Sequence, residues 1–154
     1  MKLSEIIKED CVIFLEGRFS KESLLEKFTD LFYKTGRIAD RYSTLSSLID
    51  RERLGSTGLG DEIAIPHAKI ASVNDVKIAI GISRNGIEYA SSDGLPVKVF
   101  FVVLAPDSDI SAHLRTLSRI SKLVKLTDFK RRVLEAQNPS EVLHILKTEE
   151  SKLE

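Results

Sequence analysis

Residues 97–104, VKVFFVVL, are apolar at every position but one. A strand with one face in solvent alternates apolar and polar residues, whereas consecutive apolar residues are typical of a central strand covered on both faces. The fully apolar run at residues 99–105 has seven residues and is too short to span a bilayer. We therefore expect a sheet built around this strand, with helices on both of its faces.

Helix and strand patterns alternate on both sides of that strand. Apolar periodicity and capping residues predict helices at residues 3–8, 21–35, 42–54, 111–126, 128–136 and 140–149, and strands at residues 11–15, 63–65, 76–83, 87–90 and 97–104. This order predicts one α/β domain with a mixed β-sheet flanked by helices on both sides. The domain is expected to cover residues 1–150. The last residues, EESKLE, are expected to fray and to leave a C-terminal tail at residues 151–154.

Two local patterns give finer predictions. Asn85-Gly86 is a strong hairpin signal and predicts a turn between the strands at residues 76–83 and 87–90. In the helix at residues 111–126, the spacing of Leu114, Leu117 and Ile120 predicts the buried face.

The composition gives no sign of a nucleic-acid or membrane partner. Lysine plus arginine equal aspartate plus glutamate, 23 against 23, among 154 residues. The single cysteine, Cys11, excludes an internal disulfide, and we expect it to be a small buried apolar residue. The N-terminal residues do not resemble a signal peptide. We therefore expect a cytoplasmic protein.

The segment GSTGLGDEIAIPHAK, residues 55–69, is the strongest candidate for a functional site. Pro66 lacks a backbone N–H, so the strand before it is expected to stop there. This places His67 at a strand-to-loop junction, where an imidazole can meet another molecule as nucleophile, proton carrier or metal ligand. The alternative is a strand-end histidine that only binds nearby backbone.

His113 is predicted in the first turn of the helix that follows the central strand. Functional groups of α/β proteins gather beyond strand ends, so His67 and His113 meet if both junctions lie at one edge of the sheet. The alternative is a solvated first-turn residue. The third histidine, His144, is expected on a helix surface, and we assign it no role.

Phosphate-binding groups precede His67. Arg51 and Arg53 end the helix before the glycine-rich loop, and an arginine presents a fork of donors suited to phosphate. Ser56 and Thr57 can add hydroxyls to the loop's backbone donors. The alternative is that the arginines only interact with the helix dipole. Two neutral imidazoles, an arginine and a donor-rich loop suit a phosphorylated histidine, with no metal and no cofactor.

Three other functions fit the sequence less well. GSTGLG could cradle a nucleotide, but neither G-x-x-x-x-G-K-[ST] nor G-x-G-x-x-G is present. A metal site of His67 and His113 with Asp107 or Asp109 lacks the usual ligand spacings. A triad hydrolase would need a nucleophile elbow such as G-x-S-x-G, which is absent.

The segment RERLGSTGLGDEIAIPHAK resembles the active-site signature of enzyme IIA domains of the phosphoenolpyruvate-dependent phosphotransferase system, in the fructose/mannitol class. DGLPVKVFFVVLAP and AHLRTLSRISKLV are similar to the same family, so the resemblance covers essentially the whole chain. It implies a phosphotransferase component with a phosphohistidine intermediate on His67. The second histidine of the family corresponds to His113 and its arginine to Arg51, with Arg53 as the alternative. Ala68 stands where many members carry glycine, and we expect no loss of function from it.

The resemblance also implies partners. Phospho-HPr or an HPr-like carrier would phosphorylate His67. The acceptor would be the IIB domain of a sugar permease, and a membrane would be reached only through that permease. The alternative is a regulatory IIA protein of the nitrogen-related branch, which controls target proteins according to its phosphorylation state. The lack of a fused IIB, IIC or HPr-like segment favours a separate or regulatory subunit, and HLRTLSRISKL is closer to the regulatory branch.

Overall fold

Strand β6 (Val97–Pro106) is the centre of the computed structural model, which describes residues 1–154. Every β6 residue except Lys98 is buried. Strand β5 (Lys77–Ile87) pairs with one side of β6 in antiparallel orientation, and the short strands β3 (Ile63–Ala64) and β4 (His67–Ile70) pair with its other side in parallel orientation. The prediction of a central strand covered on both faces is confirmed.

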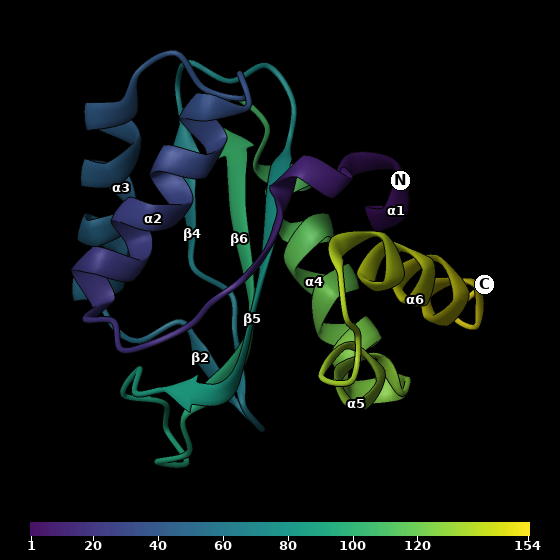
Figure 1. Ribbon diagram of the computed structural model, residues 1–154. Coiled ribbons are helices and arrows are strands. Elements are labelled where there is room, and N and C mark those ends of the chain that lie inside the picture. The colour runs from purple at the N-terminus through teal and green to yellow at the C-terminus, as the bar shows by residue number, and fades with distance from the viewer.

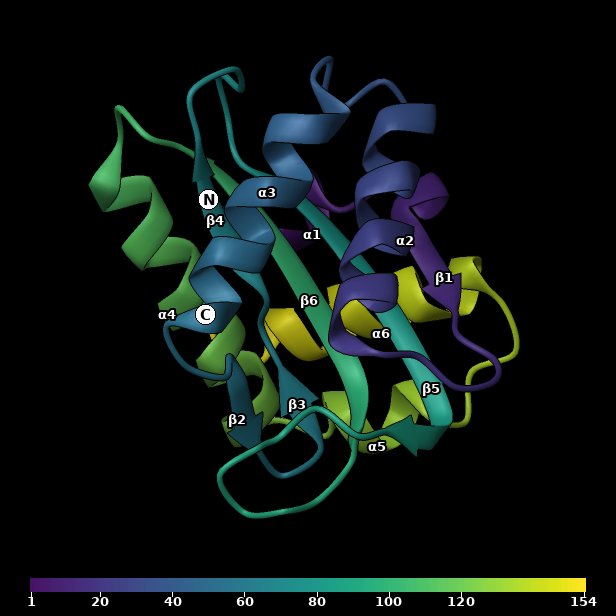
Figure 2. The ribbon, with the colours of Figure 1, turned by 90° about the vertical axis from the view of Figure 1, so that its left-hand side faces the viewer.

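Two layers of helices enclose the mixed sheet, as Figures 1 and 2 show. Its strand order is β1-β5-β6-β3-β2, with β4 also paired to β6. The remaining elements are α1 (Leu3–Ile6), the 3₁₀ turn η1 (Glu9–Cys11), β1 (Val12–Phe14), α2 (Lys21–Lys34), α3 (Arg41–Arg53), β2 (Gly58–Gly60), α4 (Ile110–Leu126), α5 (Phe129–Val133) and α6 (Pro139–Ser151). Helices α2 and α3 cover one face of the sheet, and α1, α4, α5 and α6 cover the other.

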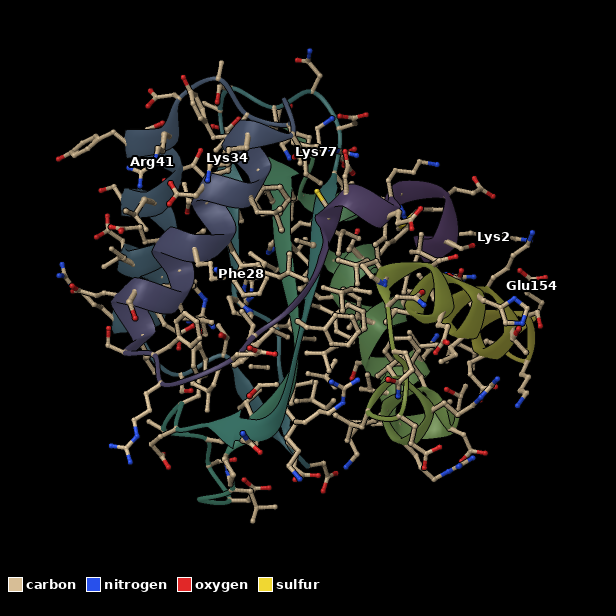
Figure 3. All side chains as sticks on the ribbon, in the orientation of Figure 1. Lys2, Phe28, Lys34, Arg41, Lys77 and Glu154 are labelled. Atoms are coloured by element: carbon tan, nitrogen blue, oxygen red, sulfur yellow. The ribbon has the colours of Figure 1, made fainter.

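The alternation of side chains along β6 separates two hydrophobic cores. Phe100 belongs to the core under α2 and α3, whereas Phe101 belongs to the core on the opposite face, where it packs against Phe129 of α5. Phe28 of α2 lies between its helix and the sheet, with its ring centroid 6.3 Å from that of Phe100 (Figure 3). Burying each such side chain stabilises the fold by about 1.5–3 kcal/mol. Cys11 is buried among these apolar side chains, as predicted.

The predicted hairpin at Asn85-Gly86 is wrong, because β5 continues through both residues. Ile82 pairs with Val99 and Ile87 with Val97, so the residues between the two isoleucines form a bulge. Gly86 has a φ of 82°, a conformation that glycine adopts without strain. Pairing with the long buried strand outweighs the local turn preference. The connection to β6 lies instead at residues 88–96.

The C-terminal end is more ordered than the sequence suggests. Fraying is wrong for Glu149 and Glu150, both of which are buried in α6. The Glu150 carboxylate accepts hydrogen bonds from the backbone N–H groups of Leu3 (2.6 Å) and Ser4 (3.0 Å) and from Arg119 Nε (2.8 Å). The last residue also contacts the N-terminal segment, since Glu154 lies 3.1 Å from Lys2 Nζ (Figure 3). None of the helices is both long and apolar enough to cross a bilayer.

Glu150→Ala should lower the free energy of unfolding by about 2 kcal/mol, because three donors lose a charged acceptor, one of them a buried N–H. Urea denaturation measures the change. Glu154→Ala is the matched control, and its solvent-accessible ion pairs with Lys2 and Arg119 should contribute less than about 1 kcal/mol. Equal losses in the two variants would contradict this role of Glu150.

Candidate histidine site

His67 opens β4 rather than following the end of a strand, which corrects the sequence prediction. Pro66 lacks an N–H, but its carbonyl still accepts a hydrogen bond of 2.9 Å from Val103 N. The chain therefore stays beside β6 and rejoins it in the same register, with Ile63 opposite Val99 and His67 opposite Val103. As an edge strand paired only with β6, β4 leaves the half-buried His67 accessible from one side.

One ring nitrogen of His67 is engaged and the other is free. Nδ1 lies 2.7 Å from the carbonyl oxygen of Ile65. A carbonyl only accepts, so Nδ1 carries the proton and Nε2 of the neutral ring carries the lone pair. The backbone-bound alternative is thus correct for one nitrogen, and it leaves the other available for chemistry.

His113 lies beside His67, as the sequence suggested. The two ring centroids are 5.1 Å apart, with planes tilted by 52°. Asp109 caps α4 by accepting a hydrogen bond of 3.0 Å from Ala112 N, and the first helical turn then places His113 against β4. His113 is only 6% exposed, so it is not a solvated first-turn residue. Its Nδ1 is buried without a hydrogen-bond partner, which leaves Nε2 as the nitrogen that can act in the cleft.

The structure separates the two arginines. Arg51 lines the cleft with both histidines, and its guanidinium donates a hydrogen bond of 2.8 Å to the carbonyl of Gly55. Arg53 lies toward α2, with its guanidinium 3.7 Å from Glu22 and 4.0 Å from Asp50. Of the two, only Arg51 lies beside His67.

A cleft of about 620 Å³ lies between α3, β4 and α4, and these residues line it. Its lining residues are Ser47, Asp50, Arg51, Leu54, His67, Ala68, Lys69, His113, Leu114 and Leu117. Leu54 and Leu114 are 85% and 60% exposed, so an apolar rim surrounds the imidazoles. Leu114 therefore does not belong to the buried face of α4, contrary to the predicted stripe, whereas Ile120 is buried there as expected.

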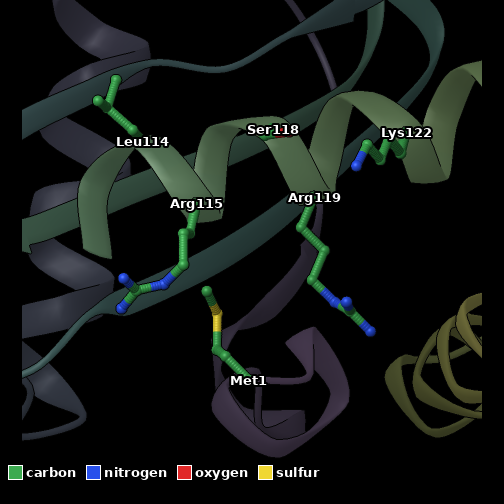
Figure 4. A pocket seen from close by; sticks show the side chains of 6 residues that line it. All are labelled: Met1, Leu114, Arg115, Ser118, Arg119 and Lys122. Carbon is green, nitrogen blue, oxygen red and sulfur yellow. The ribbon is translucent and has the colours of Figure 1, made fainter. Parts of the chain in front are cut away.

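A second depression, of about 430 Å³, lies along the following turns of α4. Arg115 and Arg119 lie on either side of Met1 there, with Lys122 one turn further on (Figure 4). Arg119 is already paired with Glu150, and the depression contains neither a histidine nor a carboxylate. The chemistry-bearing residues lie in the first cleft.

The glycine-rich loop differs from its prediction. Its hydroxyls bind within the protein instead of lining the cleft: Ser56 Oγ donates to the carbonyl of Tyr89 (3.0 Å), and Thr57 Oγ1 donates to Glu52. Gly58 and Gly60 form strand β2, which pairs with β3. Glu52, which the sequence analysis did not single out, is buried behind this loop. No group of three or more His, Cys, Asp or Glu side chains is placed to hold a metal ion.

Burial is the main cause of a lowered pKa for both imidazoles. The positive charge of Arg51 lowers the pKa of His67 further, while the hydrogen bond to Ile65 opposes the shift. For His113, the neighbouring His67 adds to the effect of burial. Both rings are therefore neutral at neutral pH.

The titration of these histidines gives a test. We expect NMR midpoints for His67 and His113 below the value of about 6.5 that an unfolded chain shows. At a pH between the lowered pKa of the folded state and the pKa of about 6.5 of the unfolded state, the unfolded chain binds more protons than the folded chain. The free energy of unfolding should therefore fall as the pH drops below about 6.5. Midpoints at or above those of the denatured protein would contradict the neutral-imidazole description.

The fold is thus an α/β domain with two adjacent histidines at one edge of a mixed sheet. The family model described as "Phosphoenolpyruvate-dependent sugar phosphotransferase system, EIIA 2" matches residues 5–149. The chain belongs to this family. The resemblance seen in the sequence is thereby confirmed.

Relatives of both functional branches are similar to this chain. The fructose-specific EIIABC component of Bacillus subtilis is 33% identical over 146 residues, which are 95% of this chain but only 23% of that protein. The fructose-specific EIIA component of Haloferax volcanii is 33% identical over 144 residues, or 94% of each chain. The nitrogen regulatory protein of Klebsiella oxytoca is 30% identical over 149 residues, covering 95% of this chain and 90% of that one.

A solved structure agrees with this fold. The nitrogen regulatory protein IIA-Ntr from Neisseria meningitidis superposes with a TM-score of 0.84 at 28% identity, over 94% of this chain and 98% of that chain. The single α/β domain with a mixed, doubly covered sheet is therefore confirmed.

Proposed function

We propose that this chain is a phosphoryl carrier that accepts a phosphoryl group on Nε2 of His67 from phospho-HPr or an HPr-like protein and passes it to a IIB domain. The observation that carries the proposal is the state of His67. Its Nδ1–H is bound to a backbone carbonyl, and its opposite nitrogen is free beside His113 and Arg51. Membership of a phosphotransferase-component family supports the same function.

The transfer step exchanges one P–N bond for another and uses neither a metal nor a cofactor. The P–N bond to the donor's phosphohistidine breaks as the Nε2 lone pair of His67 forms a new P–N bond. His67 keeps its proton on Nδ1, and the donor imidazole leaves with the electron pair of the broken bond. The new positive charge on the ring is shared with Nδ1–H, which the Ile65 carbonyl stabilises.

The neighbouring groups stabilise the charge that develops on the phosphoryl oxygens. Arg51 supplies a permanent positive charge at the cleft. A buried N–H without an acceptor is rarer in proteins than a bare acceptor, so we place the proton of His113 on Nε2. From there it can donate to a phosphoryl oxygen.

Partner docking would use the exposed apolar rim of the cleft. Two proteins must reach His67 in turn, and transient interfaces rely on a few apolar anchors within a polar border. Leu54 and Leu114 provide such anchors. The Escherichia coli protein IIAMtl, which shares this fold with a TM-score of 0.74 at 19% identity, has been solved in complex with phosphorylated IIBMtl.

The proposal is tested by incubating the chain with phospho-HPr or a phosphorylated HPr-like carrier. The intact mass should increase by one phosphoryl group, and the modification should be labile in acid and stable in base, as a phosphoramidate is. An unmodified chain, or a phosphate that resists acid, would contradict the proposal.

A second candidate is a regulatory IIA protein whose phosphorylation state controls its targets. The similarity to nitrogen regulatory proteins in sequence and structure favours it. Addition of a fructose-type IIB domain to the phosphorylated chain discriminates between the two. Phosphate moves from His67 to the IIB domain if the chain serves sugar uptake, and it stays on His67 if the chain is regulatory.

A further inference from the structure

Glu52 is a buried carboxylate that the transfer chemistry does not use directly. It is 8% exposed, in the last turn of α3, next to Arg51. Its oxygens accept hydrogen bonds from Thr57 N (3.0 Å), from Thr57 Oγ1, from Tyr89 OH (2.7 Å) and from Lys21 Nζ (2.9 Å). Helices α2 and α3, the glycine-rich loop and the β5–β6 connection are thus joined at one carboxylate.

A short series of hydrogen bonds connects this carboxylate to His67. Glu52 holds Thr57 through its backbone N–H and its hydroxyl. The Thr57 carbonyl accepts a hydrogen bond of 3.0 Å from Ile65 N. The Ile65 carbonyl in turn accepts the hydrogen bond of 2.7 Å from His67 Nδ1.

The backbone N–H of Ile65 is bound to Thr57 rather than to β6, while the neighbouring residues Ala64 and Pro66 are bound to β6. The paired residues of β3 end at Ala64 and those of β4 begin at His67. The carbonyl that fixes the tautomer of His67 therefore belongs to a residue anchored on Thr57. The same loop supplies the Gly55 carbonyl that binds Arg51.

We propose that Glu52 is a positioning residue for phosphoryl transfer, which acts through Thr57 and Ile65 to keep the proton of His67 on Nδ1 and the lone pair on Nε2. This inference rests on the proposed function of His67. A carboxylate suits the role because it only accepts hydrogen bonds, whereas an amide would turn one NH₂ group toward the surrounding donors. A positioning error of about 1 Å costs up to roughly 100-fold in rate, so a loosened Ile65 carbonyl should be measurable.

The fold provides a matched control in Glu149. This carboxylate is also buried, and it accepts hydrogen bonds from Asp128 N (2.9 Å) and Arg132 (3.0 Å) on the α5–α6 side of the sheet. Glu149→Gln disturbs a comparable set of hydrogen bonds with no connection to His67. Comparing it with Glu52→Gln separates general destabilisation from positioning.

The experiment measures two quantities in Glu52→Gln, Glu149→Gln, Thr57→Val and Thr57→Ser. Nitrogen NMR of the labelled imidazole reports the tautomer of His67, and rapid-quench kinetics reports phosphoryl transfer from phospho-HPr. Denaturation identifies a temperature at which every variant is folded. Thr57→Val replaces the hydroxyl by a methyl group, keeps the backbone N–H, and covers the case in which Glu52→Gln does not fold.

We expect Glu52→Gln to show a mixture of His67 tautomers and transfer slowed roughly 10- to 100-fold, with the same final extent of labelling. Thr57→Val should change the His67 tautomer and the transfer rate in the same direction as Glu52→Gln, but by less. Thr57→Ser should show the wild-type tautomer and rate, and Glu149→Gln should change neither quantity. Wild-type tautomer and rate in both Glu52→Gln and Thr57→Val, or equal slowing in Glu149→Gln, would overturn the inference. A wild-type chain that takes up no phosphate would instead refute the proposed function.

Discussion

Replacement of His67 by glutamine should abolish phosphorylation by phospho-HPr without unfolding the protein. An amide nitrogen has no basic lone pair, so no P–N bond can form at this position. His67 is half-buried at the start of an edge strand, and its imidazole is hydrogen-bonded to the nearby Ile65 carbonyl, so replacing the side chain should leave both cores intact. Intact-mass spectrometry measures the label, and circular dichroism on heating measures the fold.

His144→Gln is the matched control for that substitution. His144 is exposed on α6, on the helical layer that includes α5. The control variant should be labelled to the wild-type extent. Undiminished labelling of His67→Gln would show that another residue accepts the phosphate.

His113→Ala should still be phosphorylated, but about 100-fold more slowly, because one preorganised donor to the phosphoryl oxygens is lost. Rapid-quench kinetics with phospho-HPr gives the rate constant. His113→Gln provides a comparison, since its amide can still donate a hydrogen bond and should recover part of the rate. A wild-type rate in His113→Ala would place His113 outside the transfer step, despite the 5.1 Å between the two ring centroids.

The parts of the fold that the sequence predicts are those set by burial and by capping. The apolar run of β6 predicts its central position, and it is buried almost throughout. Ser20 caps α2 by accepting a hydrogen bond of 3.0 Å from Ser23 N, and Gly36, with a φ of 77°, follows its end. The capping signals depend only on neighbouring residues, and the apolar run depends only on whether a side chain is buried or exposed to solvent.

Two of the failures, those at Pro66 and Gly86, share a cause, because a strong local preference yields to pairing with β6. Pro66 removes one donor but does not separate the chain from its neighbour, so His67 begins a strand. Gly86 forms a bulge instead of a hairpin turn for the same reason. In both cases the long-range partner contributes more hydrogen bonds and burial than the local turn could.

The candidate site was predictable in its residues but not in its arrangement. Positions next to strand ends and helix ends indicate His67, His113 and Arg51 as candidates, while their meeting depends on how α3, β4 and α4 pack at one sheet edge. Glu52 gives no signal in the sequence, because a glutamate near a helix end is ordinarily solvated. Only the fold shows that Thr57 and Tyr89 surround its carboxylate.

Nitrogen NMR of the chain after phosphorylation by phospho-HPr tests the central claim most directly. The account predicts coupling between phosphorus and Nε2 of His67, with a protonated Nδ1 that remains hydrogen-bonded to the Ile65 carbonyl. Phosphorus bonded to Nδ1 of His67, to His113, or to any residue outside this cleft would contradict it.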